Sequence, residues 1–285
     1  MLKTEHRSEL KSMDILALDA HALESLFHND RENSLSKLLT SIGSHLRNYV
    51  DSFREYIRDT PEDSSAIRKD IAELKSRLDK VNYINIREQM IAIPEGYTGI
   101  NYLEYLNELL TLVRSSDTVT SNLCAEYKKL IDVIAVNGSD KVLMTDYQKL
   151  YSDATTHRDL ILSTLHKFFT DSHVAIGPIK NVLSSLSEIN KYDSYVFELV
   201  NNSKPETLNK LSKEVEEIHT SLDVLLANIS KHSVVIHGPD IVDIGQGAYA
   251  LAQYMEAIGL LYYNIVVAIN RVHDLVTMLL TESYR

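Results

Sequence analysis

The chain is poor in the residues that make tight turns and covalent cross-links. It has 9 glycines, 5 prolines, one cysteine and no tryptophan among 285 residues. Few glycines and prolines argue against an all-β fold, which needs many tight turns, and favour long helices joined by short loops. The single cysteine, Cys124, cannot form an intrachain disulfide, so the composition does not indicate a secreted protein stapled by disulfides.

Positive charge is also scarce. The 29 Lys and Arg residues stand against 40 Asp and Glu residues, which gives a formal net charge of -11. Nucleic-acid binding needs clustered Lys and Arg, so we expect no nucleic-acid partner. The first ten residues are charged and lack the apolar segment of a secretory signal. We therefore expect the protein to be cytoplasmic, or to lie within a virus particle that is assembled in the cytoplasm.

The common motifs of catalysis and metal binding are missing or isolated. No serine lies in a G-x-S-x-G elbow, and no glycine-rich loop precedes Lys-Ser or Lys-Thr. Glu216 and His219 form the only E-x-x-H, whereas a di-iron carboxylate bundle needs two such motifs and two further glutamates. Because Ile218 occupies an apolar seam, we expect Glu216 and His219 on a solvated face. We predict no catalytic residue, no cofactor, no metal and no enzymatic activity; a helical enzyme with a site built from scattered residues is the alternative.

One segment looks like a dinucleotide-binding fingerprint. Gly245, Gly247 and Ala250 give the spacing G-x-G-x-x-A after a β-like run. The fingerprint needs a short helix, then a second strand carrying an acid about 20 residues on. Here a helical pattern continues to Thr281 instead. We interpret the segment as a turn that leads into a helix.

The clearest pattern in the chain is an apolar stripe over residues 248–281. Its spacing alternates between three and four residues, which is typical of a helix that packs in heptad register. Gln253, Glu256, Asn264 and Asn270 interrupt the segment, whereas a membrane span needs about 20 predominantly apolar residues. We predict a buried central helix and no membrane span. Its predicted core residues are Leu251, Met255, Ile258, Tyr262, Ile265, Ile269, Val272, Val276 and Leu279.

The same periodicity, read with capping signals, predicts helices along most of the chain. The expected helices cover 14–28, 33–59, 61–81, 101–136, 145–170, 177–200 and 205–229. A polar run in the fourth leaves open whether it is one helix or two, and we favour one. The fold class is therefore all-α, a multi-helix bundle of long antiparallel helices with heptad-type seams.

Two segments do not fit the helical period. Residues 82–100 read as an extended linker, because short alternations there precede Pro94 and Gly96. We expect this linker to join an N-terminal helical region, 1–81, to a main bundle, 101–285, built around the helix 248–281. Near 233–244, β-branched residues on both sides of Gly238-Pro239 predict a small β-hairpin or an extended crossover.

A charged residue interrupts each of two neighbouring apolar seams. Arg158 lies on the seam of the helix 145–170, and Asp193 lies on the seam of the next helix. If the two helices form an antiparallel hairpin, these residues are level to within ~3 Å along the axis. We predict a partly buried Arg158–Asp193 salt bridge as a structural polar pair; the alternative is that both charges are solvated.

Tyrosine is the abundant aromatic residue, with 16 Tyr against 5 Phe. Its ring buries a large apolar area while the hydroxyl stays polar, and tyrosine is enriched at protein interfaces. One interpretation places Tyr83, Tyr97, Tyr102 and Tyr105 at the edges of the core. The other gives some of them to an interface.

Two functions fit these features. The first is a structural or assembly protein, a helical component of a larger complex, with protein partners or self-association through its helical faces. In composition the chain is broadly similar to scaffold, connector and internal virion proteins of tailed phages, although no specific motif carries that similarity. The second is a regulatory helical module that binds a peptide or a small ligand.

Overall fold

The structure is a computed structural model. It describes residues 37, 39–41, 43–44, 46–48, 50–51, 65–81, 90–94, 99–138, 144–168, 174–178, 186–202, 205–231, 233–234, 236 and 238–282. The helix predicted over 14–28 lies outside these residues. Tyr83, Tyr97 and the side chains of Tyr102 and Leu279 do so as well.

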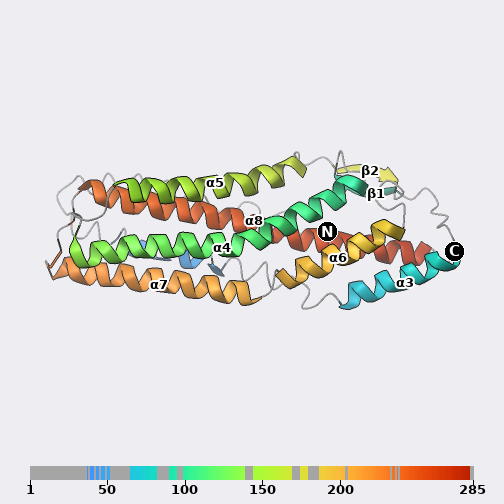
Figure 1. The fold of residues 1–285 in the computed structure, drawn as a ribbon, viewed down its shortest axis with the longest axis horizontal. Coiled ribbons are helices and arrows are strands. Elements are labelled where there is room, and N and C mark those ends of the chain that lie inside the picture. Colours follow the sequence, from blue (N-terminus) through green and yellow to red (C-terminus); the bar gives the residue numbers. More distant parts are fainter. Residues whose placement is uncertain are drawn as a thin grey trace. The chain divides into compact units, whose positions relative to one another are not determined.

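Helices account for nearly all of the described residues, which confirms the predicted all-α class (Figure 1). The described residues between positions 37 and 51 are also helical. The named helices are α3 (Ser65–Val81), α4 (Gly99–Asn137), α5 (Met144–Phe168), α6 (Leu186–Asn202), α7 (Pro205–Ser230) and α8 (Gly238–Glu282). Two short strands, β1 (Met90–Pro94) and β2 (Val174–Pro178), complete the described elements.

The chain divides into two compact units. Unit 1 comprises Met1–Val50, Ser121–Thr156 and Leu211–Met255, and unit 2 comprises Asp51–Thr120, His157–Lys210 and Glu256–Arg285. Helices α4, α5, α7 and α8 contribute residues to both units. The division therefore does not follow the boundary expected at 82–100, because residues 1–81 supply part of each unit.

The two strands form an antiparallel pair in unit 2, with Met90 opposite Pro178 and Pro94 opposite Val174. β1 lies in the segment expected to be a linker. β2 includes Gly177 and Pro178, where we had expected a helix to begin, and α6 begins only at Leu186. Paired residues of the two strands are 80 or more positions apart, and periodicity within one segment carries no information about such a partner.

The predicted hairpin or crossover near 233–244 is wrong from residue 238 onward, because α8 begins at Gly238. Proline in the first turn of a helix is favourable, since its missing N–H has no helical partner there, and Pro239 takes that place. The β-branched Ile244 then continues the apolar stripe through Ala248 and Leu251, all of them buried. The helical spacing explains these residues better than strand propensity does.

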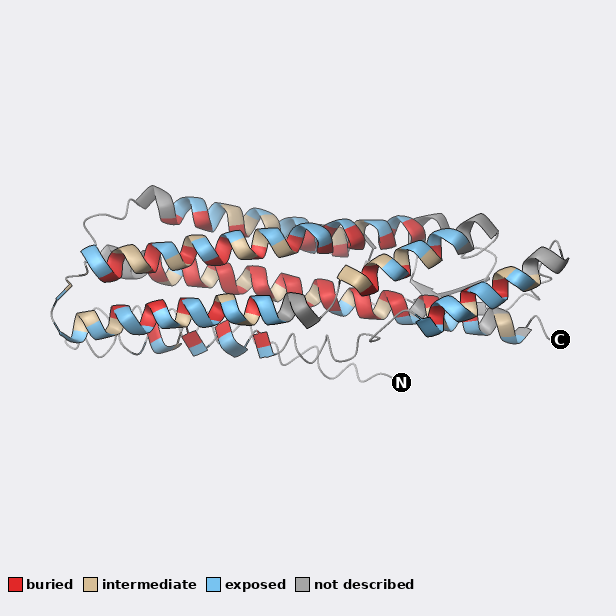
Figure 2. Ribbon diagram, turned by 60° about the horizontal axis from the view of Figure 1, so that its bottom comes forward, coloured by how far each residue is buried: buried red, intermediate tan, exposed pale blue. Residues whose placement is uncertain are grey.

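The residues predicted as the core of α8 are almost fully buried, and buried positions recur along the described helices (Figure 2). None of the eight whose side chains are described is more than 4% exposed: Leu251, Met255, Ile258, Tyr262, Ile265, Ile269, Val272 and Val276. By length and composition alone, Ile244–Asp274 in α8 is long and apolar enough to cross a membrane, but 67% of its most apolar stretch is buried inside the protein. A core helix passes the same test.

The polar run in α4 does not break the helix, since Gly99–Asn137 is one element of 39 residues. Ser116 and Thr120 are buried there, and their hydroxyls donate to backbone carbonyls of the same helix, those of Val113 and Ser116. A buried hydroxyl satisfied in this way can occupy an apolar seam. The seam thus passes through Ser116 and Thr120, whereas Asp117 pairs with Lys210.

One interpretation of the sequence placed tyrosines at the edges of the core, but several described tyrosines lie inside it. Tyr105 is 1% exposed, and Tyr127, Tyr192 and Tyr254 are also among the largest fully buried side chains. Tyr151 and Tyr263, in contrast, are 44% and 47% exposed. The tyrosines therefore divide between the core and the surface.

We expect Ile265→Asp to lower the free energy of unfolding by about 3 kcal/mol or more, because it buries an unpaired charge at a position with 0% exposure. Urea denaturation followed by circular dichroism measures this change. Thr277→Asp is the matched control on an exposed position of the same helix, with an expected change within about 0.5 kcal/mol. Equal effects of the two substitutions would show that the register of α8 is wrong.

Candidate functional site

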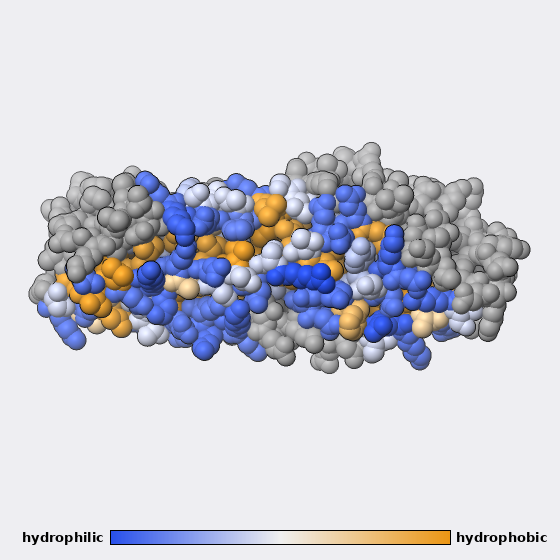
Figure 3. Space-filling view, viewed as in Figure 1, coloured by the Kyte–Doolittle hydropathy of each residue, from blue (hydrophilic) through white to orange (hydrophobic). Residues whose placement is uncertain are grey.

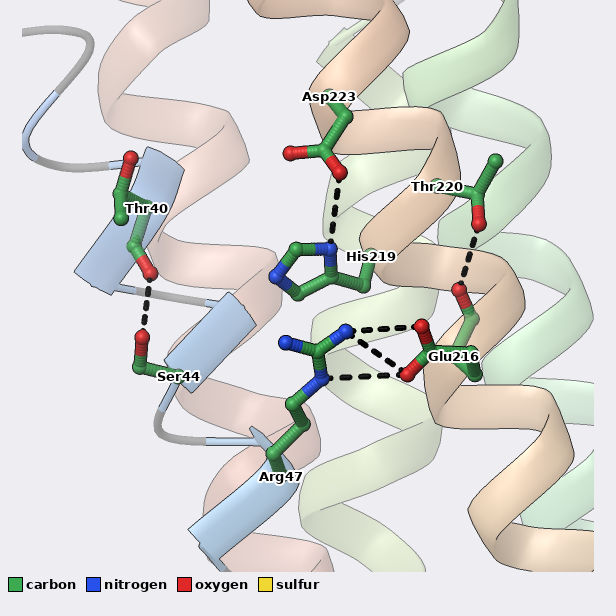
Figure 4. Close-up of polar contacts among 7 residues, drawn as sticks. All are labelled: Thr40, Ser44, Arg47, Glu216, His219, Thr220 and Asp223. Atoms are coloured by element: carbon green, nitrogen blue, oxygen red, sulfur yellow. Dashed lines mark hydrogen bonds and ion pairs between the residues drawn. The ribbon is translucent and has the colours of Figure 1, made fainter.

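A polar cluster in unit 1 joins the described helical residues between positions 37 and 50 to α7 (Figure 4). Arg47 donates through Nη2 to Oε1 of Glu216 at 2.8 Å, and through Nε and Nη2 to Oε2 at 3.1 and 2.9 Å. Such two-pronged geometry fixes orientation as well as distance. Both side chains are well exposed, at 44% and 60%, so the pair contributes at most about 1 kcal/mol to stability.

His219 is the less exposed member of this cluster. Its Nδ1 lies 3.1 Å from Oδ2 of Asp223, and its side chain is 19% exposed against 62% for Asp223. The imidazole faces Gly43: a Cβ built at that glycine would lie 2.7 Å from Cδ2 of His219. Only glycine leaves room for the ring in this position. The solvated face predicted for Glu216 and His219 is therefore half right, because Glu216 is exposed while His219 is largely covered.

The hydroxyls of the cluster bond within their own helices. Ser44 donates to the carbonyl of Thr40 at 3.0 Å, and Thr220 donates to that of Glu216 at 3.0 Å. In the part of the chain that the structure describes, no group of three or more His, Cys, Asp and Glu side chains is placed to hold a metal ion. The ion pair of Arg47 with Glu216 and the packing of His219 against Gly43 hold one helix against another.

The apolar periodicity of the sequence did not identify two members of this cluster, Gly43 and Arg47. A signal was present, because Leu39, Gly43, Leu46 and Val50 are all buried and follow one another at intervals of four, three and four residues. A glycine at a seam position indicates a close approach by another group. The sequence does not say that the approaching group is His219, which is 176 residues away.

The two glycines of the fingerprint-like segment lie inside α8, so the expected turn is absent there. A Cβ at Gly247 would lie 3.2 Å from Cε2 of Tyr127 and 3.4 Å from Cδ2 of Leu150. The hydroxyl of Tyr127 also donates to the carbonyl of Ile244 at 3.2 Å. Gly247 thus admits a buried aromatic ring, and the turn that the fingerprint needs for a pyrophosphate is replaced by helix.

Cys124 is 2% exposed on α4, as expected for a seam position. Burial, and secondarily the charge of Glu214, raise the pKa of its thiol far above the usual value. The thiolate is the nucleophilic form of cysteine. Its surroundings therefore oppose nucleophilic chemistry.

In unit 2, the two charges predicted to pair with each other have other partners. Oδ1 of Asp193 lies 3.0 Å from Nε of Arg68, and Oδ2 lies 3.4 Å from Nζ of Lys75. The guanidinium of Arg68 also stacks over the ring of Phe197, 4.7 Å from its centroid. Arg158 instead bonds to its neighbour Asp159 at 2.7 Å. Asp193 thus connects α6 to α3.

On α6 the reason is that Tyr192 takes the buried position next to Asp193. Tyr192, Val196, Leu199 and Val200 are buried there, and Asp193 lies on the side of the helix that meets α3. On α5 the seam lies where it was expected, since Ala154, Ile161 and Leu165 are buried, but Arg158 bonds within its own helix. Strand β2 also lies between α5 and α6, so the two are not joined as a simple helical hairpin.

Other charged contacts in unit 2 also link helices. Arg77 donates to the carbonyl of Leu280 at 2.7 Å, and Arg114 lies 3.0 Å from Glu198. These contacts therefore position helices relative to their neighbours within each unit. Comparison of the chain with protein-family models, with curated proteins and with solved structures gives no match.

We expect Gly43→Ala and His219→Ala to be strongly coupled. In a helix interior, alanine is favoured over glycine by about 1 kcal/mol, but the new methyl group would clash with the His219 ring. Gly43→Ala should therefore stabilise the His219→Ala protein and destabilise, or fail to stabilise, the wild type. Urea denaturation of the four proteins should give a coupling energy of about 1 to 3 kcal/mol. A Gly43→Ala effect that is the same in both backgrounds would contradict the contact.

A second cycle tests the partners of Asp193. We expect Arg68→Met and Asp193→Asn to show a coupling energy of about 0.5 to 1 kcal/mol, a modest value because Arg68 is 46% exposed. Arg158→Met with Asp193→Asn is the matched control and should show a coupling near zero. The assignment of partners fails if the control pair has the larger coupling in unfolding measurements.

Proposed function

We propose that this protein is a non-enzymatic structural component of a larger complex, a scaffold of long antiparallel helices in heptad register that binds protein partners or itself through helical faces. The observation that carries the proposal is the set of large apolar side chains exposed on α4, α5, α6, α7 and α8. They are between 38% and 76% exposed: Val136, Tyr151, Leu160, Leu162, Phe197, Val224 and Tyr263.

Isolated apolar residues are ordinary on protein surfaces, so the argument depends on the helices that carry them. Each of these helices already has a buried apolar seam. The exposed residues are additional to that seam, and hydrophobic side chains appear between hydrophilic ones at the surface (Figure 3). Tyr151 and Tyr263 are of the residue type most enriched at interfaces. A helix that buries one face and offers apolar groups on another is suited to assembly.

The polar contacts support the same proposal. Those at Arg47 and Asp193 join helices, and burial keeps the thiol of Cys124 in its unreactive form. An excess of acidic over basic residues keeps such a scaffold soluble before assembly. The cytoplasm, or a virus particle assembled there, is the location that we propose.

A measurement of the mass and composition of the native complex tests this function. We expect the full chain in native extract to sediment as part of a large complex in which it is abundant, because a structural component is present in many copies. Velocity sedimentation with quantification of the co-sedimenting chains measures both properties. A monomer or dimer with a partner present in much smaller amount would instead indicate a regulatory module.

A further inference from the structure

Helix α8 is buried on most sides but has one open stripe in unit 2. Glu256, Leu260, Tyr263 and Val267 follow one another at intervals of four, three and four residues, so they share one side of the helix. Tyr263 is 47% exposed, and the other three are of intermediate exposure. The neighbouring positions Ile258, Leu261 and Ile265 are buried. This strip of the central helix is therefore partly open to solvent, with Tyr263 exposed and Leu260 and Val267 partly covered.

Glu256 lies at one end of this strip and has no partner of opposite charge among the described residues. In the part of the chain that the structure describes, its carboxylate forms no ion pair or hydrogen bond, and partial burial raises its pKa. A carboxylate that loses hydration without gaining a partner is unfavourable in the free protein. A cation placed over the strip would remove this cost.

The apolar strip and the unpaired carboxylate together define the chemistry that a binding partner needs. An apolar strip with residues at helical spacing is complementary to the apolar side of an amphipathic helix. To pair with Glu256, the partner helix needs a Lys or Arg at the edge of its apolar side. A second copy of this chain is disfavoured, because each copy has a net charge of -11.

We propose that the strip Glu256–Leu260–Tyr263–Val267 is the docking site for an amphipathic helix of another protein, whose apolar side covers Leu260, Tyr263 and Val267 and whose basic residue pairs with Glu256. This inference rests on the proposed assembly function, and it specifies the surface and the charge of the partner.

The first test uses a pair of designed peptides and the full chain. Each peptide is an amphipathic helix with a leucine stripe, and its length of about 18 residues is sufficient for helix formation. One peptide carries lysine beside the stripe, and the other carries glutamate at the same positions. Fluorescence anisotropy should show the lysine peptide binding at least tenfold more tightly. Tyr263→Ser should weaken that binding about tenfold, and the nearly isosteric Glu256→Gln about fivefold. Tyr151→Ser, at a tyrosine of similar exposure in unit 1, should leave it unchanged.

Attraction of the lysine peptide to the overall negative charge would give binding that is insensitive to both Glu256→Gln and Tyr263→Ser. That result would overturn the proposal, as would absence of binding. Far-ultraviolet circular dichroism and thermal unfolding of each variant verify that the fold is retained.

The second test places a photo-reactive phenylalanine analogue at position 263 or 151 and identifies the cross-linked segment in native extract by mass spectrometry. Cross-links from 263 to a basic amphipathic segment of another protein support the docking site. Cross-links from 263 to a second copy, or within the chain to residues 1–36, assign a different occupant and overturn it. Cross-links from 151 alone leave the assembly function intact while this site fails. If neither position cross-links and the chain sediments as a monomer, the proposed function fails too.

Discussion

The apolar surface of α8 is the constraint on which the rest of the structure depends. This helix has 45 residues, and its buried positions include four consecutive turns around Ile258, Tyr262, Ile265 and Ile269. Burying a side chain of this size stabilises the folded state by about 1.5 to 3 kcal/mol, so the gross gain over the eight buried core positions of α8 is at least comparable to the net stability of an ordinary domain. Neighbouring helices accommodate this surface: Gly247 leaves room for Tyr127, whose hydroxyl is satisfied by the Ile244 carbonyl.

Charged contacts contribute in another way. The Arg47–Glu216 pair and the contacts of Asp193 lie at or near solvent, where screening and side-chain entropy reduce the net stabilisation. Their geometry still discriminates between alternative helix positions, because a helix shifted by one turn would separate the partners. Together with the fit of Gly43 against His219, they select one arrangement among several that would bury similar apolar area. We infer that burial supplies the stability and the polar contacts supply the specificity of packing.

The strength of the local pattern determined how well each element could be predicted. The stripe of α8 spans many turns and was readable from Ala248 onward, although the first turns of the helix, from Gly238, were missed. The polar run of α4 is compatible with a single helix because its buried hydroxyls bond to the backbone of their own helix. Shorter patterns were ambiguous by one residue: on α6, Tyr192 and Asp193 are adjacent, and local spacing did not show which of them is buried. The pairing of β1 with β2 and the contact of Gly43 with His219 depend on residues distant in sequence. No periodicity within a segment encodes them.

Hydrogen exchange of backbone amides tests the central role of α8 most directly. If α8 is the core, amides near Ile265 should exchange only through global unfolding, with an opening free energy equal to that measured by denaturation. Amides on α3 and near the ends of α7 should exchange faster, through local opening. The account is contradicted if amides near Ile265 exchange as fast as those of α3, because a helix that opens without global unfolding cannot be the element on which the fold depends.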